Sequence, residues 1–199
     1  MKPIENWEKV KPIGGDNVQL PAGGYVCKIL GAKVVENSKH RDMLEVGVDI
    51  SHGEYAGFFR NKFDAQTDKS KWINAAILRI NLPDKNLDTQ DEYNKKAGRV
   101  KKFIQDVEES NTPYVFQWDE QTLKNKFVGC LFGREEFETK DGGKAWSTKL
   151  FYTTTLANIQ TGNFKVPADR PFKESVSTEP VQTDFAPVPD MDSDDDLPF

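Results

Sequence analysis

A strict alternation of side chains between Leu44 and Ile50 constrains the fold of this chain most. Every second residue of this run is apolar, and the residues between are small or acidic. A period of two places all the apolar side chains on one face, which predicts a half-buried β-strand. Other runs predict further strands at 24–35, 58–63, 127–137 and 145–156. Residues 71–82 fit either a strand or a helical turn followed by a strand.

One helix is predicted between these strands. Thr89 and Glu92 have the spacing of a capping box, in which each side chain accepts a hydrogen bond from the backbone amide of the other residue. Apolar residues then follow in steps of four and three and form one stripe: Tyr93, Ala97, Val100, Ile104 and Val107. Asn111 and Pro113 end the pattern.

The order of these elements is three or four strands, one helix and two strands. A five-stranded Greek-key barrel with a helix between its third and fourth strands is the OB-fold, which commonly binds oligonucleotides. We therefore expect a mainly β protein with one helix, folded as an OB-fold-like five-stranded barrel.

The two ends of the chain differ from its middle. Residues 1–22 are rich in Pro and Gly and predict an extended N-terminal arm, and residues 23–166 form the expected OB-like domain. Residues 167–199 predict a disordered Pro-rich linker with an acidic tip, because they carry too little apolar surface to offset the entropy of ordering. Residues 170–199 have a net charge of −6, whereas 1–169 have +1 within a total of −5. The negative net charge of the whole chain is thus compatible with a nucleic-acid partner for residues 1–169.

Several classes of protein are excluded by composition. Cys27 and Cys130 are far apart in the sequence, and neither has a second thiol or a histidine at ligand spacing, which argues against a disulfide scaffold or a zinc site. No stretch approaches the ~18 apolar residues of a membrane span, and the N-terminus lacks the apolar segment of a signal peptide. We expect a cytoplasmic protein without cofactor or metal.

The last residues carry the most specific motif. Asp194, Asp195 and Asp196 are followed by Leu197, Pro198 and the terminal Phe199. This ending resembles the C-terminal tip of bacterial single-stranded DNA-binding proteins. The resemblance implies that Phe199 enters an apolar pocket of a replication or repair enzyme, while the Asp run meets a basic surface. An aromatic ring and a carboxylate on one residue make a compact anchor.

The body is similar to an uncharacterised phage family found among replication and recombination genes. The points of similarity are 24–26, 53–57, 109–111, 133–136 and 161–167. This similarity implies a role in phage DNA metabolism, in the bacterial host cell, and carries no catalytic residues.

Basic and aromatic residues interleave along the expected strands and loops. Aromatic rings can stack on bases without sequence preference, and cations can follow the phosphates. The candidate DNA-binding residues are Lys39, Arg41, Phe58, Arg60, Lys62, Trp72, Arg79, Lys144, Trp146, Lys149 and Phe151.

We expect a non-enzymatic protein that binds and protects single-stranded DNA and recruits partners through its tip. One alternative is a Mg²⁺-dependent nuclease, because Pro83-Asp84 and Glu138-Thr139-Lys140 spell a dispersed PD…ExK pattern. Another is a recombination adaptor or annealing protein. The oligomeric state stays open, and a homo-oligomer is one option.

Overall fold

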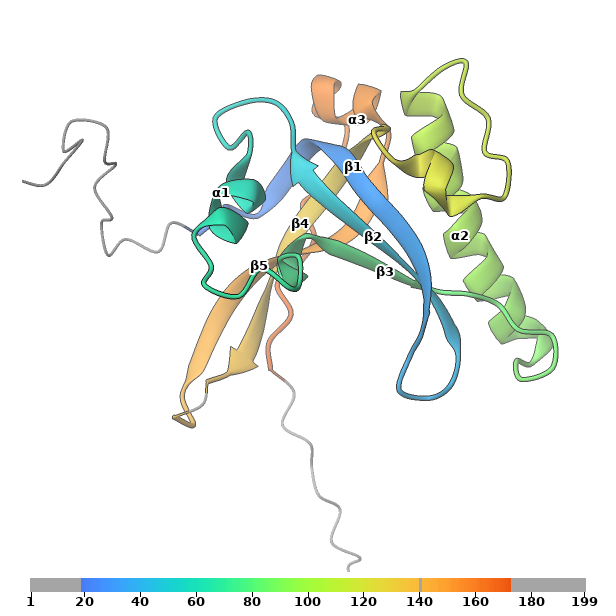
Figure 1. The fold of residues 1–199 in the computed structure, drawn as a ribbon, viewed down its shortest axis with the longest axis horizontal. Coiled ribbons are helices and arrows are strands. Elements are labelled where there is room, and N and C mark those ends of the chain that lie inside the picture. Colours follow the sequence, from blue (N-terminus) through green and yellow to red (C-terminus); the bar gives the residue numbers. More distant parts are fainter. Residues whose placement is uncertain (1–18, 140, 173–199) are drawn as a thin grey trace, which may run out of the picture.

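A computed structural model describes residues 19–139 and 141–172 as one mainly β structure. Five strands form an antiparallel sheet in the order β3-β2-β1-β4-β5 (Figure 1). The strands are β1 (Gly23–Glu36), β2 (Asp42–Ile50), β3 (Ile77–Asn81), β4 (Phe127–Glu138) and β5 (Lys144–Thr154). The helices are α1 (Phe58–Asp64), α2 (Gln90–Ser110) and α3 (Leu156–Thr161), with short 3₁₀ helices η2 (Asn74–Ala76) and η3 (Glu120–Leu123).

Two parts of the predicted fold class are wrong. The edge strands β3 and β5 do not pair with each other, so the sheet is not closed into a barrel. The described residues also contain three α-helices where one was predicted. The prediction of a mainly β protein is confirmed.

The segment 58–63, predicted as a strand, is the helix α1. Gly57 precedes it with φ 74°, and the backbone N–H of Phe59 donates to the buried Asp49 carboxylate at 3.1 Å. Burial raises the pKa of Asp49, although hydrogen bonds from the amides of Phe59 and Ile50 act in the opposite direction. Residues four apart share a face in both a helix and a strand, so Phe59 and Phe63 could not distinguish the two structures.

Short helical segments set two further strand boundaries, the start of β3 and the end of β5. Residues 71–82 contain both of the expected structures, because η2 leads directly into β3. The last strand ends at Thr154, short of the predicted Leu156. There the Thr155 hydroxyl accepts from the Asn158 amide and begins α3.

The predicted helix and its cap are confirmed in α2. The Thr89 hydroxyl accepts from the amide of Glu92, and the Glu92 carboxylate accepts from the amide of Thr89. At the other end, the Asn111 side chain bonds both the N–H and the C=O of Phe127. The end of α2 is thereby tied to the start of β4.

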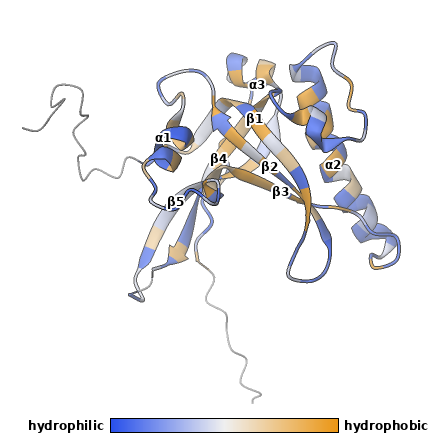
Figure 2. Cartoon of the chain, in the orientation of Figure 1, coloured by the Kyte–Doolittle hydropathy of each residue, from blue (hydrophilic) through white to orange (hydrophobic). Residues whose placement is uncertain are grey.

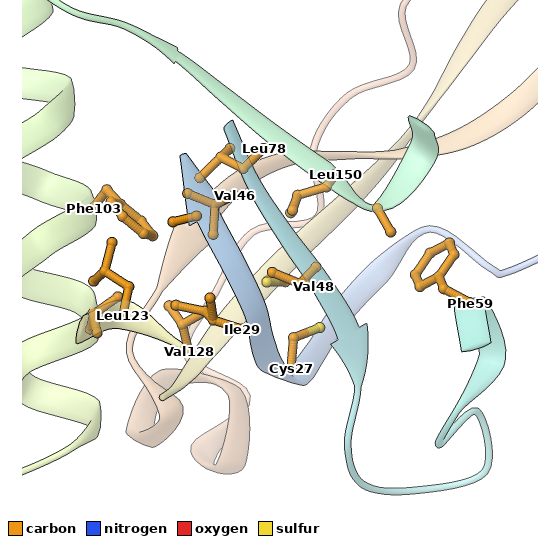
Figure 3. Packing of buried hydrophobic residues seen from close by; sticks show 14 of the residues in the cluster. Cys27, Ile29, Val46, Val48, Phe59, Leu78, Phe103, Leu123, Val128 and Leu150 are labelled. Carbon is orange, nitrogen blue, oxygen red and sulfur yellow. The ribbon is translucent and has the colours of Figure 1, made fainter. Parts of the chain in front are cut away.

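The core lies between the sheet, α2 and α1 (Figure 3). Its largest fully buried side chains include Phe59 from α1, Phe103 from α2 and Phe132 from β4. The thiols of Cys27 and Cys130 are free and buried on the neighbouring strands β1 and β4. Burial, together with the adjacent Cys130, raises the pKa of the Cys27 thiol well above its ordinary value.

The apolar stripe of α2 is only partly buried. Val107 is fully buried, whereas Tyr93, Ala97, Val100 and Ile104 are half-buried and line a shallow groove with Phe116 and Trp118. Hydrophilic residues dominate much of the remaining surface of α2 and the β1–β2 loop (Figure 2).

Short segments at both ends of the described chain contact the sheet. Leu20 is buried, and its carbonyl accepts a hydrogen bond from the Thr148 hydroxyl of β5. At the other end, the backbone of Arg170 bonds Arg134 and Glu136, beyond the part of β4 that pairs with β1. Strand edges left unpaired tend to be covered in this way. Most of the predicted arm and linker (1–18 and 173–199) lies outside the described residues.

Candidate nucleic-acid interface

The outward face of β1, β2 and β3 carries a row of charged side chains. Lys33, Glu45 and Arg79 are paired across the three strands. The Lys33 Nζ lies 3.6 Å from a carboxylate oxygen of Glu45, and the Arg79 Nε donates to the other oxygen at 2.8 Å. One carboxylate thus neutralises two cations only in part and leaves the row positive.

The next row is formed by glycines. Gly31 of β1 lies opposite Gly47 of β2. A Cβ atom at Gly31 would meet nothing within 4 Å, and one at Gly47 would lie 3.6 Å from the Trp72 ring. The backbone is therefore accessible here, and the register of β1 and β2 shifts between Ile29 and Gly31. Glycines inside strands mark such irregularities as well as places where a ligand approaches closely.

Trp72 forms an aromatic wall beside this floor. Its indole N–H donates to the carbonyl of Val48 at 3.2 Å, which fixes the ring against β2. The Phe63 ring lies 5.1 Å away between centroids, and the Arg60 guanidinium lies 5.1 Å from the Trp72 centroid. Both aromatic rings and guanidinium planes can stack on nucleic-acid bases.

These residues line one groove of about 1100 Å³, which we call the sheet groove. Among the residues that the structure describes, one carboxylate, that of Glu45, and five cations line it: Lys33, Arg60, Lys69, Lys71 and Arg79. The loop between α1 and η2 contributes Lys69 and Lys71, both exposed. The groove combines a glycine floor, an aromatic wall and a positive rim, and a positive groove with aromatic rings is the combination that suits a single-stranded nucleic acid.

The structure brings three of the predicted DNA-binding residues into this groove: Arg60, Trp72 and Arg79. Phe58 and Lys62 are elsewhere on α1. The Phe58 ring packs against Tyr55 and Phe59, and the Lys62 ammonium lies 4.6 Å from the centre of that ring. Burial lowers the pKa of Lys62.

The β1–β2 loop holds two further candidates. Lys39 is exposed in it. Arg41 forms an ion pair with Asp88 and also donates to the carbonyl of Leu87, so it connects this loop to the start of α2. Lys96 bonds the same Asp88 carboxylate at 2.5 Å. Arg41 therefore has a structural contact that competes with any phosphate.

The four candidates on β5 lie outside the sheet groove and contact other parts of the chain. Lys144 lies 5.7 Å from the Phe172 ring centre, and Trp146 faces the Arg134 guanidinium at 5.4 Å. Lys149 pairs with Glu135. Phe151 lies under Arg170, whose guanidinium is 3.7 Å from the ring centre.

Several lining residues were not predicted from the sequence: Lys33, Phe63, Lys69, Lys71 and the two floor glycines. The pair of lysines beside Trp72 was a usable signal, since a cation next to an aromatic residue is the pattern expected for base stacking. Lys33 and the glycines gave no signal, because only strand register brings them to Trp72.

The two parts of the nuclease pattern lie far apart. Asp84 lies in the connection between β3 and α2, and Glu138 ends β4 in the β4–β5 hairpin, on the opposite side of the molecule (Figure 1). Within residues 19–139 and 141–172, no three His, Cys, Asp or Glu side chains cluster as a metal site would require. Lys140 lies outside the described residues.

No protein-family model and no curated protein matches this sequence. Among the helices that the structure describes, none combines the length and the apolar character needed to cross a membrane.

Proposed function

We propose that this chain binds single-stranded DNA in the sheet groove and acts in phage DNA replication or recombination. The observation that carries the proposal is the placement of Trp72 and Arg60 beside the Gly31–Gly47 floor, within a rim of four further cations. A single strand exposes base faces to such a wall, whereas a duplex keeps its bases stacked inside.

The strand order supports an OB-like interpretation of the body. β1 pairs with both β2 and β4, and α2 lies between β3 and β4 in the sequence. OB-folds are partly open Greek-key barrels that bind oligonucleotides on the face of strands 2 and 3. The sheet groove crosses that same pair of strands.

Recruitment of a replication or repair enzyme by the C-terminal tip is a second part of the proposal. It is supported by the sequence alone, since residues 194–199 lie outside the described structure. The two parts are separable, because the groove is formed entirely by residues 30–121.

The decisive experiment is a titration of the full chain with a fluorescent oligothymidine and with a duplex of equal length, at two salt concentrations. We expect tighter binding of the single strand, with a salt slope of about −0.7 per phosphate neutralised. The double variant Lys69→Gln/Lys71→Gln should weaken binding and reduce this slope. Lys85→Gln/Lys165→Gln removes the same charge from exposed positions outside the groove and is the matched control.

Equal affinity for the duplex, or equal effects of the two double variants, would contradict binding in the sheet groove. Cleavage of the oligonucleotide in the presence of Mg²⁺ would support the nuclease alternative instead.

A further inference from the structure

A second basic groove lies at the open side of the sheet, between the unpaired edge of β3, α2 and β5. We call it the helix groove; its volume is about 640 Å³. Cations from β3, from α2 and from the chain after α3 line it: Arg79, Lys95, Arg99, Lys102 and Arg170. No carboxylate is among its lining residues in the described part of the chain.

The α2 side of the helix groove is shaped to receive an anionic chain. Lys95, Arg99 and Lys102 are spaced by four and three residues, so they share one face of the helix. Gly98 lies on the same face, and a Cβ atom there would meet nothing within 4 Å. A glycine inside a helix costs about 1 kcal/mol relative to alanine. Here it leaves a gap between the cations, through which a ligand can approach the helix backbone.

Two of these cations have no acidic partner among the described residues. Lys102 pairs with the buried Asp106, whose other oxygen accepts from the Thr153 hydroxyl of β5 at 2.8 Å. Within residues 19–139 and 141–172, by contrast, no carboxylate pairs with Lys95 or Arg99. Their charges are available to phosphates.

The β5 side adds an aromatic surface. Tyr152 is 53% exposed, and its hydroxyl accepts from Arg170 at 3.1 Å. The same guanidinium covers the Phe151 ring. The opposite wall is β3. In the described part of the chain β3 pairs with β2 alone, so the backbone amides on its other edge have no strand partner there. Such amides bind phosphate oxygens.

Arg79 connects the two grooves, since it lines both. We propose that the helix groove binds the sugar–phosphate backbone of a second segment of the same DNA strand. On this path the DNA leaves the sheet groove, crosses β3 at Arg79 and enters the helix groove. This inference rests on the proposed single-stranded DNA binding and extends its path.

The test compares two lengths of oligothymidine on the full chain. About 5 and about 16 nucleotides span the range of site sizes known for one such domain. The double variant Lys95→Gln/Arg99→Gln should bind the short strand as the unaltered chain does, because that strand fills only the sheet groove. It should bind the long strand at least tenfold more weakly, with a salt slope reduced by about 1.4, or 0.7 for each of two phosphates.

The control Lys85→Gln/Lys101→Gln removes two exposed cations, one of them from α2, without touching the helix groove. It should leave the affinity for both oligothymidine lengths unchanged.

An equal loss of affinity for both lengths in Lys95→Gln/Arg99→Gln, or no loss for the long strand, would overturn the inference while leaving the proposed function intact. Tighter DNA binding by Lys95→Gln/Arg99→Gln would also overturn it, since the groove would then hold the acidic C-terminal segment in competition with DNA. An unaltered chain that binds neither length would overturn the proposed function as well.

Discussion

The indole N–H of Trp72 donates a hydrogen bond to the backbone carbonyl of Val48. The bond crosses from the loop after α1 to the second half of β2, and it holds the ring beside Gly47. Trp72 therefore has a fixed position at the edge of the glycine floor before any ligand binds. A preorganised ring loses little entropy when a base stacks on it.

Replacing Trp72 should reduce DNA affinity by an amount that depends on whether the new residue keeps a ring. Trp72→Phe keeps a stacking ring but loses the bond to Val48, so we expect a small loss. Trp72→Ala removes the ring and should weaken binding by about 1–3 kcal/mol in a fluorescence titration. Trp118→Ala is the control, because Trp118 is 87% exposed and lies outside the sheet groove. A loss for Trp118→Ala as large as that for Trp72→Ala would contradict the assignment.

Two strand glycines should differ in their sensitivity to substitution by alanine. A Cβ atom at Gly129 of β4 would lie 2.7 Å from Ile159 Cγ1 and 2.8 Å from the Thr155 carbonyl oxygen. Gly129→Ala should therefore lower the free energy of unfolding by about 1–3 kcal/mol, as overpacking does. Gly31→Ala enters open space and should change it by less than about 0.5 kcal/mol. Urea denaturation measures both, and equal stability of the two variants would contradict the packing of α3 on β4.

Asp88 should make stability depend on pH in the acid range. Hydrogen bonds from Lys96, from the Asp84 amide and from Arg41 hold the pKa of Asp88 at about 2. The carboxyl has a pKa of about 3.9 in an unfolded chain. The folded state thus favours the charged form, and this stabilisation is complete above pH ~4 and is lost as the pH falls towards ~2.

Asp88→Asn should accordingly lower the thermal midpoint at neutral pH and lose less stability between pH 4 and 2. Asp141→Asn in the β4–β5 hairpin serves as a control at an exposed position. Parallel stability curves for Asp88→Asn and the unaltered chain across that interval would refute the role of Asp88.

Deleting residues 191–199 should raise the affinity for single-stranded DNA. The segment 170–199 carries a net charge of −6 and is tethered to the body, so it competes with DNA for basic grooves at high effective concentration. The gain should be larger at low salt, because screening weakens the competing segment at high salt. Weaker binding after truncation would mean that the tip belongs to the DNA site.

Deleting Phe199 should affect partner binding and leave DNA binding unchanged. The deletion removes the ring and moves the terminal carboxylate onto Pro198. Binding of the terminal nonapeptide to a bacterial exonuclease or helicase that recognises such tips should fall at least tenfold, or about 1.4 kcal/mol. Changing Asp194, Asp195 and Asp196 to Asn should mainly slow association. Titration calorimetry measures the first effect, and equal binding with and without Phe199 would contradict recruitment by the tip.

The sequence by itself determined the elements whose signals are local. The alternation from Leu44 to Ile50 predicted β2, and the Thr89–Glu92 capping box predicted the start of α2 at the correct residue. Each of these signals depends on residues within a few positions of one another. Where two periods coincide, as at Phe59 and Phe63, the local signal failed and a helix was mistaken for a strand.

Only the tertiary structure decided which residues share a surface. Lys33, Glu45 and Arg79 meet because β1, β2 and β3 pair in one register, and a shift of one residue would turn each side chain to the other face. The same pairing places Gly31 and Gly47 beside Trp72, and the open edge of β3 places Arg79 between two grooves. Composition identified the cations and rings of this chain. Their arrangement depended on long-range strand pairing, which has no signature in any short stretch of sequence.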